Sequence, residues 1–289
     1  MTTENEHCIG LIAGAGRFPF LVLEGARRAG CHVTVVGLTG LADPALAEHA
    51  DVFHWAGLAR IGRWMRILKQ SRAERVILAG AVQKSRMYGR FRLLKALPDW
   101  TALRLWFFTI PDKRNDTILG AVADAFAKQG IIMEDCVRYA SDHLAPPGVL
   151  TRCQPIAAQL RDADFGWPLA KQIGRLDIGQ SIAVKETEVI AVEAIEGTDA
   201  MIERAGRLCA RGGWTLVKVA KPSQDMRFDV PTVGPGTIAQ LKRNGARMLV
   251  IEAGKTVIVD RSEFLAEADA AGIVVLARAD TPGQTEPKP

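Results

Sequence analysis

The chain has 289 residues, of which 48% are hydrophobic and 24% charged, so its composition excludes a largely disordered protein and its length allows two domains. A net charge of +5 favours an anionic partner, such as a phosphorylated metabolite, a nucleic acid or an acidic membrane. Five scattered cysteines without a C-x-x-C pair exclude a disulfide framework, and the polar start and the lack of a long apolar run predict neither signal peptide nor membrane span.

The first 140 residues alternate between apolar runs and amphipathic segments. Strands are predicted at 8–13, 32–38, 51–56, 75–81 and 130–135. Helices are predicted at 19–29, 60–71, about 90–108 and 115–129. Continuous apolar strands that alternate with helices indicate a parallel sheet covered on both faces. We therefore predict a Rossmann-like nucleotide-binding domain over residues 1–140.

A second α/β domain is predicted over residues 156–280, after a proline-rich linker at 141–155. Two alternating runs in "SIAVKETEVIAVEA" predict a β-hairpin. Helices are predicted at 155–176, 198–211, 235–244 and 262–271, and further strands at 214–219, 247–252, 255–260 and 273–278. The polar, proline-rich residues 281–289 are predicted to be a disordered tail.

Glycines follow two of the predicted N-terminal strands. "GLIAGAGRFP" places Gly14, Ala15 and Gly16 between a strand and a helix, where backbone N–H groups can bind a phosphate. The third glycine of a dinucleotide fingerprint is missing, as is an acidic residue for a ribose, which argues against NAD. Gly80 and Ala81 have a similar position after another strand. Both turns are candidate nucleotide sites, and a purely structural role is the alternative.

Acidic and hydroxyl side chains follow the second strand of the predicted hairpin. Glu193 ends the apolar run "VIAV", where an unpartnered carboxylate is costly to bury. Thr198 suits a helix N-cap, and Asp199 would complement the positive end of the helix. We include Glu193, Thr198 and Asp199 among the candidate site residues, with capping as the bland alternative.

The strongest candidate is the loop in "KVAKPSQDMRFDVPTVGPGT". It holds Lys221, Asp225, Arg227 and Asp229 between two prolines, just after Lys218. Carboxylates suit Mg²⁺, and Lys and Arg suit phosphate oxygens, so the loop is typical of a magnesium-pyrophosphate site. A solvated loop whose charges pair among themselves is the alternative.

Residues 91–108 mix aromatic with basic side chains. A pair of core helices is the more usual reading of such a segment. An interfacial or acyl-binding helix is the alternative, because such helices combine Trp and Phe with Lys and Arg.

The motifs "VIAVEAIEGTDAMIERAG", "LVKVAKPSQDMRFDVPTVGPGTI" and "IGLIAGAGRFP" together resemble the LpxI family of UDP-2,3-diacylglucosamine pyrophosphatases, over about residues 8–278. The resemblance implies Mg²⁺-dependent hydrolysis to UMP and 2,3-diacylglucosamine 1-phosphate (lipid X) in lipid A biosynthesis, with water attacking the phosphorus on the sugar side. It also implies a homo-oligomer of two α/β domains with the active site in the cleft between them.

The family's catalytic aspartate falls on Asp225, which would bind the metal or orient the attacking water. Lys218, Lys221 and Arg227 would offset phosphate charge, and Asp229 would be a second metal ligand or a partner of Arg227. By the same resemblance, Glu193, Thr198 and Asp199 would face the cleft, Gly14, Ala15 and Gly16 would approach the nucleotide, and the 91–108 segment would receive acyl chains.

Two other functions compete with this one. A Rossmann-type oxidoreductase or nucleotide-sugar transferase would bind a nucleotide without metal-dependent cleavage. A module that binds anionic surfaces would lose binding steeply with salt. The charge excess is small and no nucleic-acid motif occurs, so we expect no nucleic-acid partner. We expect a cytoplasmic enzyme acting on a lipid-linked UDP-sugar, with peripheral contact to the inner membrane left open.

Overall fold

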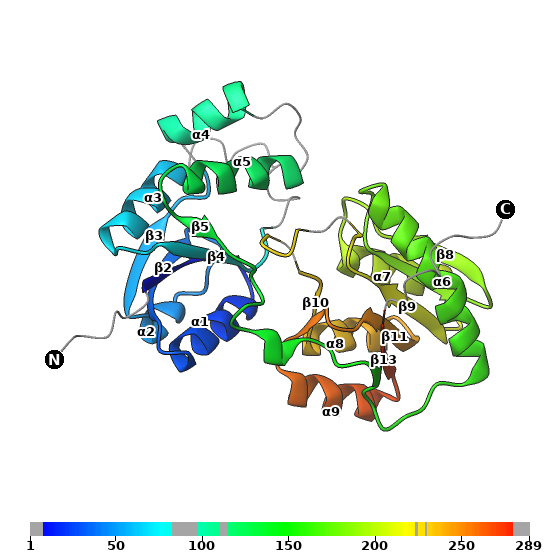
Figure 1. The fold of residues 1–289 in the computed structure, drawn as a ribbon. Coiled ribbons are helices and arrows are strands. Elements are labelled where there is room, and N and C mark those ends of the chain that lie inside the picture. The colour runs from blue at the N-terminus through cyan, green and yellow to red at the C-terminus, as the bar shows by residue number, and fades with distance from the viewer. Residues whose placement is uncertain (1–7, 83–97, 110–114, 223–224, 229, 280–289) are drawn as a thin grey trace. The chain divides into compact units, whose positions relative to one another are not determined.

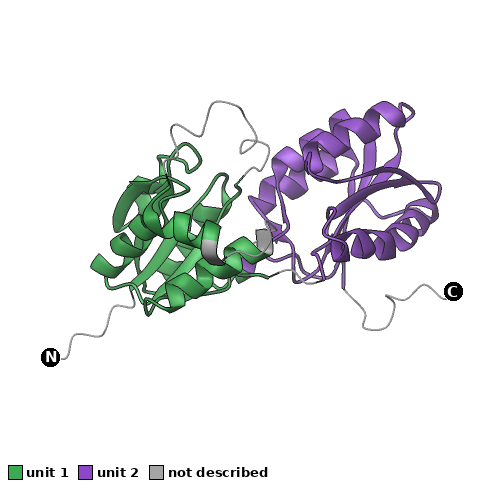
Figure 2. Ribbon diagram, turned by 90° about the horizontal axis from the view of Figure 1, so that it is seen from above, with its two compact units in different colours: residues 1–141, 225–229 green, residues 142–224, 230–289 purple. Residues whose placement is uncertain are grey.

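Two compact units make up the chain in the computed structural model, which describes residues 8–82, 98–109, 115–222, 225–228 and 230–279 (Figure 1). Unit 1 comprises residues 1–141 and 225–229, and unit 2 comprises residues 142–224 and 230–289 (Figure 2). The short segment 225–229 thus belongs to unit 1, although the chain on both sides of it belongs to unit 2. Within the described ranges, no helix has the length and apolar character needed to cross a membrane.

Unit 1 is built on a parallel sheet of five strands in the order β3-β2-β1-β4-β5. The strands are β1 (Cys8–Ala13), β2 (His32–Leu38), β3 (Val52–Ala56), β4 (Arg75–Ala79) and β5 (Ile132–Met133). The chain starts in the centre of the sheet, adds β2 and β3 on one side, and then adds β4 and β5 on the other. Ligands of such sheets bind beyond the carboxyl ends of the strands where the order reverses, here between β1 and β4. The predicted parallel sheet is confirmed.

Helices cover both faces of this sheet (Figure 1). They are α1 (Phe18–Arg28), α2 (Leu46–His49), α3 (Ile61–Gln70), α4 (Trp100–Arg104), the π-helical turn η2 (Leu105–Thr109) and α5 (Asn115–Ala127). Apolar side chains of α3 and α5 share one core with Ile12, Val36 and Val76 of the sheet, and Phe228 joins the same core. Part of the predicted helix 90–108 lies outside the described residues, and the remainder is α4 and η2.

Unit 2 has a mixed sheet of six strands in the order β6-β13-β11-β9-β7-β8. The strands are β6 (Gly148–Val149), β7 (Ser181–Lys185), β8 (Glu188–Val192), β9 (Trp214–Lys218), β11 (Ala246–Glu252) and β13 (Val274–Arg278). β9, β11 and β13 are parallel, whereas β7 runs antiparallel to both β8 and β9. The predicted hairpin is therefore confirmed as β7 and β8. A separate parallel pair consists of β10 (Thr232–Val233) and β12 (Val257–Ile258).

Four helices pack on the two faces of the second sheet. They are α6 (Ala157–Arg175), α7 (Thr198–Leu208), α8 (Pro235–Arg243) and α9 (Arg261–Ala271). α7, α8 and α9 share one core with the sheet, and α6 packs against the other face. The segment predicted to link the domains contains the 3₁₀ turn η3 (Ser141–His143) and β6, which pairs antiparallel with β13. The predicted tail lies outside the described residues.

Candidate functional site

The two predicted glycine turns of unit 1 pack against each other. Ala15 and Ala81 form an antiparallel bridge with N···O distances of 3.0 and 2.9 Å, and the Gly14 N–H donates to the Ala79 carbonyl at 2.8 Å. A Cβ on Gly14 would lie 2.8 Å from the Gly80 oxygen, and a Cβ on Gly80 would lie 2.8 Å from the Ala15 oxygen. Close backbone approach therefore requires glycine at both positions. It also commits the N–H groups of residues 14 and 15 to the turn.

Gly16 has a different environment. Its φ of +94° favours glycine, and no atom of the described residues lies within 4 Å of a Cβ built there. It comes just before α1, whose N-cap residue, Arg17, makes no side-chain capping hydrogen bond. The positive end of a helix attracts anions. Of the three predicted nucleotide contacts at residues 14–16, Gly16 therefore offers the most open approach.

Asp225 and Arg227 form a bidentate ion pair in unit 1. Arg227 Nη2 lies 2.6 Å from Asp225 Oδ2, Nε lies 2.9 Å from Oδ1, and the Arg227 backbone N–H also donates to Oδ1 at 3.0 Å. These hydrogen bonds from Arg227 lower the pKa of Asp225, while partial burial opposes the shift. The side chains are 43% (Arg227) and 32% (Asp225) exposed, so the pair is accessible to solvent. The predicted carboxylate is ionised at neutral pH and already faces a cation.

The residues around this pair anchor it in unit 1. The Cys136 backbone N–H donates to the Met226 carbonyl at 3.1 Å. Phe228 is only 9% exposed and packs in the core under α3 and α5. The Arg227 guanidinium lies 4.9 Å from the centre of the Phe228 ring. The pair is thus exposed at its charged ends and fixed by buried neighbours on both sides.

Asp225 is compatible with a metal site that is completed by substrate phosphates, rather than one formed by protein side chains alone. The part of the chain that the structure describes contains no group of three or more His, Cys, Asp or Glu side chains that could hold a metal. Asp229, the other predicted ligand, lies outside the described residues. Both oxygens of Asp225 accept from Arg227, yet a carboxylate offers about four acceptor positions. Mg²⁺ is commonly held by one or two carboxylates together with substrate phosphates.

In unit 2, three predicted residues form one hydrogen-bonded chain. The Thr198 hydroxyl donates to Glu193 Oε1 at 3.0 Å. Lys218 Nζ donates to Thr198 Oγ1 at 3.4 Å and to the Thr232 carbonyl at 3.2 Å. Glu193 is 7% and Lys218 8% exposed, so the structure places a carboxylate and an ammonium group in largely buried positions. Thr198 joins them, so the structure brings these three candidate residues together.

Ser181 belongs to this cluster, although the sequence analysis did not identify it. It lies directly opposite Lys218 across β7 and β9, and its carbonyl accepts from the Glu193 N–H at 2.9 Å. Opposite residues of antiparallel strands project to the same face. Ser181 Oγ and Glu193 Oε2 are both buried and have no hydrogen-bond partner among the described residues. Such unsatisfied atoms are costly and often mark functional sites.

Thr198 does not have the N-cap position that was the bland alternative for it. Gly197, with a φ of +86°, is the N-cap of α7, and Thr198 is the first helical residue. Its hydroxyl bonds to Glu193 instead of to the helix backbone. Asp199 lies in the first turn of α7, as predicted, and is exposed. Glu196 bonds to Arg204 at 2.5 Å.

Lys221 is held at the start of the predicted catalytic loop. Its ammonium group pairs with Asp177, just after the end of α6. A Cβ on Gly174 would lie 3.4 Å from the Lys221 Cα, so α6 and the loop are in close contact. Ser223 and Gln224, which continue the loop, lie outside the described residues.

A buried ion pair, which no sequence pattern predicted, fixes the backbone just before Lys221. Lys171 Nζ lies 2.7 Å from Glu252 Oε2, and their side chains are 2% and 0% exposed. The same oxygen accepts from the Ala220 N–H at 2.8 Å. The sequence signal was weak: Glu252 ends an apolar strand, as Glu193 does, and Lys171 lies on the apolar face of α6.

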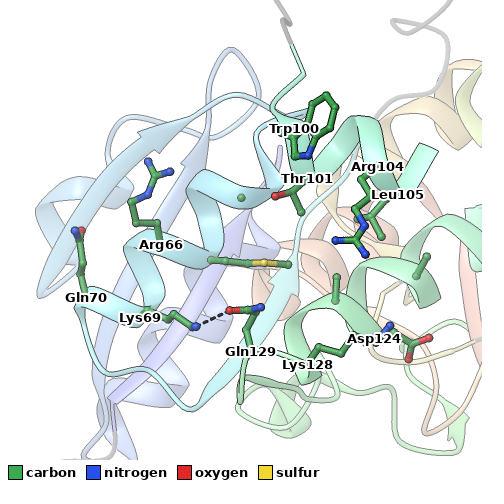
Figure 3. A pocket seen from close by; sticks show the side chains of 14 residues that line it. Arg66, Lys69, Gln70, Trp100, Thr101, Arg104, Leu105, Asp124, Lys128 and Gln129 are labelled. Carbon is green, nitrogen blue, oxygen red and sulfur yellow. Dashed lines mark hydrogen bonds between the residues drawn. The ribbon is translucent and has the colours of Figure 1, made fainter. Parts of the chain in front are cut away.

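A pocket of about 620 Å³ lies among α3, α4, η2 and α5 of unit 1 (Figure 3). Met65, Leu105 and Ala121 contribute apolar surface, and Arg66, Lys69, Arg104 and Lys128 contribute positive charge. It overlaps the segment predicted as a core helix pair or an interfacial helix. Leu105 is 7% exposed and belongs to the core, whereas Trp100 is 78% and Phe107 70% exposed. The described part of this segment therefore divides between the two readings.

These features define a protein of two α/β units, each with candidate site residues beyond the ends of its sheet strands. Family models of the LpxI N-terminal and LpxI C-terminal domains match residues 8–143 and 146–276. The UDP-2,3-diacylglucosamine pyrophosphatase LpxI of Caulobacter vibrioides is 36% identical over 281 residues, which cover 93% of this chain and 96% of that protein. The chain belongs to the LpxI family, and the resemblance found in the sequence is confirmed.

Solved structures give only a weak likeness. The biotin carboxylase of Campylobacter jejuni in complex with an ATP analogue is 13% identical, with 71% of this chain and 42% of that chain covered and a TM-score of 0.28. The biotin carboxylase domain of the Hydrogenobacter thermophilus 2-oxoglutarate carboxylase is also 13% identical, with 71% and 41% covered and a TM-score of 0.24. The chain spans less than half of each carboxylase chain. Scores this low carry no conclusion about the fold.

Proposed function

We propose that the protein hydrolyses the pyrophosphate bond of UDP-2,3-diacylglucosamine to UMP and 2,3-diacylglucosamine 1-phosphate (lipid X), a step of lipid A biosynthesis. The observation that carries this proposal is the 36% identity to a pyrophosphatase of that name over nearly the whole of both chains. Both domains of the family are matched, so the similarity includes every candidate residue found above. A nucleotide-sugar transferase or oxidoreductase is not favoured, because LpxI proteins form a family of their own.

In the proposed reaction, a water oxygen bonds to the phosphorus on the sugar side. The bond from that phosphorus to the bridging oxygen breaks, and UMP leaves with the bridging oxygen. The two protons of the water pass to phosphate oxygens of the products or to solvent. Asp225 is an ionised carboxylate at neutral pH, because Arg227 lowers its pKa. We assign to it the orientation of the attacking water through an accepted hydrogen bond.

Arg227, Lys218 and Lys221 would offset the charge of the phosphates. Charge neutralisation and positioning supply most of the catalysis of phosphoryl transfer. Arg227 has donors in a planar fork, which suits phosphate oxygens. Lys218 is held by Thr198 and by the Thr232 carbonyl, so its ammonium group has a fixed position before any substrate binds.

Mg²⁺, when bound, would add Lewis-acid stabilisation of the phosphate oxygens. Asp225 is the described side chain best suited to hold it, together with substrate phosphates. The magnesium dependence, the role of Asp229, the homo-oligomer and the active site in a cleft between the domains stay predictions.

The decisive experiment is turnover of UDP-2,3-diacylglucosamine by the purified protein, in ¹⁸O-labelled water, followed by mass spectrometry. We expect UMP and lipid X, with the label in lipid X. Chelation with EDTA and the substitution Asp225→Ala should each abolish the products, whereas the exposed control Glu48→Ala on α2 should not.

Each outcome separates one part of the proposal. Label in UMP would place the attack on the other phosphorus. Full turnover in EDTA would exclude a metal requirement. Full turnover by Asp225→Ala would exclude a catalytic role for Asp225. No product from folded wild-type protein would overturn the proposed function.

A further inference from the structure

Exposed aromatic side chains lie at the start of α4 and in η2. Trp100 is 78% exposed, Phe107 is 70% exposed and Trp106 is 41% exposed. Leu105, between them in sequence, is 7% exposed and packs into the core of unit 1, which fixes this segment to the domain. Aromatic side chains are costly to leave in water, and clustered exposure commonly marks an interaction surface.

Positive side chains surround these aromatics. They come from α3, α4 and the residues after α5, and all are exposed: Arg63, Arg66, Lys69, Arg104 and Lys128. None of them forms an ion pair with a described residue. Lys69 donates a hydrogen bond to the neutral Gln129 side chain at 2.5 Å. The same surface therefore offers five cations without an ion pair among the described residues, next to exposed aromatic rings.

Two carboxylates lie on this surface, and one of them is committed elsewhere. Asp99 caps α4, because its Oδ1 accepts from the Ala102 N–H at 3.0 Å and its Oδ2 accepts from the Arg63 N–H at 3.1 Å. Asp124 lines the pocket and raises the pKa of Arg227, after the larger contribution of Asp225. The surface keeps a clear excess of positive charge.

We propose that this surface, formed by α3, α4, η2 and the end of α5, docks on an anionic phospholipid bilayer. Trp and Phe with flanking Lys and Arg are the combination that binds at a membrane interface, where rings enter the boundary of headgroups and acyl chains. Lys and Arg are drawn to the negative headgroups. No helix among the described residues could span the bilayer, so the contact is peripheral.

The pocket in Figure 3 gives this surface a concave centre. Lys69 and Arg104 lie on opposite sides of it, and its volume is about 620 Å³. A phosphodiester headgroup that entered the pocket would meet cations on both sides and apolar surface from Met65 and Leu105. The pocket therefore adds a place for an individual anionic lipid within the docking surface.

A second copy of the chain fits this surface less well. A symmetric pair would bring the same five cations against each other, and like charges repel at short distance. A nucleic acid would match the charge, and the choice of a bilayer over it rests on the proposed function, whose substrate is a lipid.

Co-sedimentation with lipid vesicles tests the inference. We expect the full-length protein to sediment with vesicles of equal parts phosphatidylcholine and phosphatidylglycerol, much less with pure phosphatidylcholine, and less as salt is added. Trp100→Ala with Phe107→Ala should lower binding about tenfold or more. Arg66→Gln with Arg104→Gln should lower it about fivefold for each lost charge. Leu176→Ala with Leu208→Ala, two residues of unit 2 that are 70% and 65% exposed, should leave it unchanged.

Folding of each variant is checked by circular dichroism and thermal unfolding, which should not change because the substituted side chains are exposed. Equal binding to both vesicle types, or unchanged binding by the variants, would overturn the inference. Binding of single-stranded RNA that outcompetes the vesicles would assign the surface to nucleic acid instead. A change of oligomeric state in Trp100→Ala with Phe107→Ala, without a change in sedimentation, would assign it to a second copy.

Turnover of detergent-solubilised UDP-2,3-diacylglucosamine keeps this inference separate from the proposed function. If wild-type protein turns over substrate but does not sediment with vesicles, only the proposed membrane-docking surface is contradicted. If the protein sediments with vesicles but yields no UMP, only the proposed hydrolysis is contradicted.

Discussion

Two of the ion pairs in and next to the proposed catalytic loop differ in almost every physical respect. Lys171 and Glu252 are 2% and 0% exposed and lie 81 residues apart in the chain. Asp225 and Arg227 are 32% and 43% exposed and lie two residues apart. The buried pair joins a helix to a strand in unit 2, and the exposed pair closes a local turn in unit 1.

This difference indicates separate tasks. A buried pair cannot exchange its partners for water, so it holds the Ala220 backbone in one position. An exposed pair gains little stability and can open at low cost, which leaves both charges available to a metal or a phosphate. Fixed geometry before the loop and exchangeable charges within it are what a phosphate-binding site requires.

The largest effect is expected for Lys171→Met. It leaves the buried Glu252 carboxylate with the Lys255 ammonium group, 2.8 Å from Oε1, as a remaining ion-pair partner. The loss of the buried Lys171 should therefore lower the free energy of unfolding by about 3 kcal/mol. Urea unfolding measures this. As a control, Arg152→Met breaks the exposed pair with Asp269, where Arg152 is 92% exposed, and should cost less than about 1 kcal/mol. Equal costs for the two variants would break the distinction between buried and exposed pairs.

Arg227→Ala should affect activity much more than stability, in contrast to Lys171→Met. Stability should fall by at most about 1 kcal/mol, since the pair is exposed. The kcat/KM for UDP-2,3-diacylglucosamine should fall about 100-fold, as when one electrostatic donor is removed from an active site. Arg227→Lys keeps the charge but loses the planar fork of donors. Its kcat/KM should therefore lie between those of the wild-type protein and Arg227→Ala. Unchanged turnover in Arg227→Ala would leave the pair with a structural role only.

A smaller change in activity is expected for Glu193→Gln. The chain of hydrogen bonds indicates that Glu193 acts through Thr198 on Lys218, as a positioning residue. We expect kcat to fall about tenfold with KM nearly unchanged, and Thr198→Ser to keep activity. A raised KM with kcat unchanged would restore the substrate-binding role predicted from the sequence. Glu188→Gln, exposed at the start of the strand that precedes Glu193, serves as the control.

The smallest expected effect is a change of stability at acidic pH. Arg227 lowers the pKa of Asp225 in the folded state, so the pair stabilises the fold above the unfolded pKa of about 3.9. That contribution is lost as the pH falls below about 4 through the lower folded value. Wild-type protein should therefore be more stable than Asp225→Asn at neutral pH, by at most about 1 kcal/mol. The difference between their melting temperatures should shrink below pH 4, and a constant difference would contradict the assignment.

Hydrophobic periodicity predicted most of the fold. The hairpin of residues 181–192 has a period of two with charges at its turn, and the strands of unit 1 are continuous apolar runs next to glycine. These patterns are local, so one sequence is sufficient to find them. The segment 98–109 was harder, because the buried Leu105 lies within a few residues of the exposed Trp100, Trp106 and Phe107.

The candidate site was predicted where its residues are close in sequence. Glu193 and Thr198 come within one short segment. Lys218 ends β9, the next strand along the chain, which hydrophobic periodicity also predicted. Ser181 and the pair of Lys171 with Glu252 were missed, because their partners are set by strand register and helix packing. No local pattern encodes those distances. A charge at the end of an apolar strand is the one signal that could have pointed to Glu252.

The membership of residues 225–229 in unit 1 has a consequence for biosynthesis. Phe228 fills part of the core under α3 and α5, yet the ribosome adds it long after the rest of that core. At about 5–20 residues per second, the nascent domain waits several seconds for its last apolar side chain. The carboxylate proposed to be catalytic, Asp225, lies in the same segment, so its synthesis and the completion of the first domain are one event.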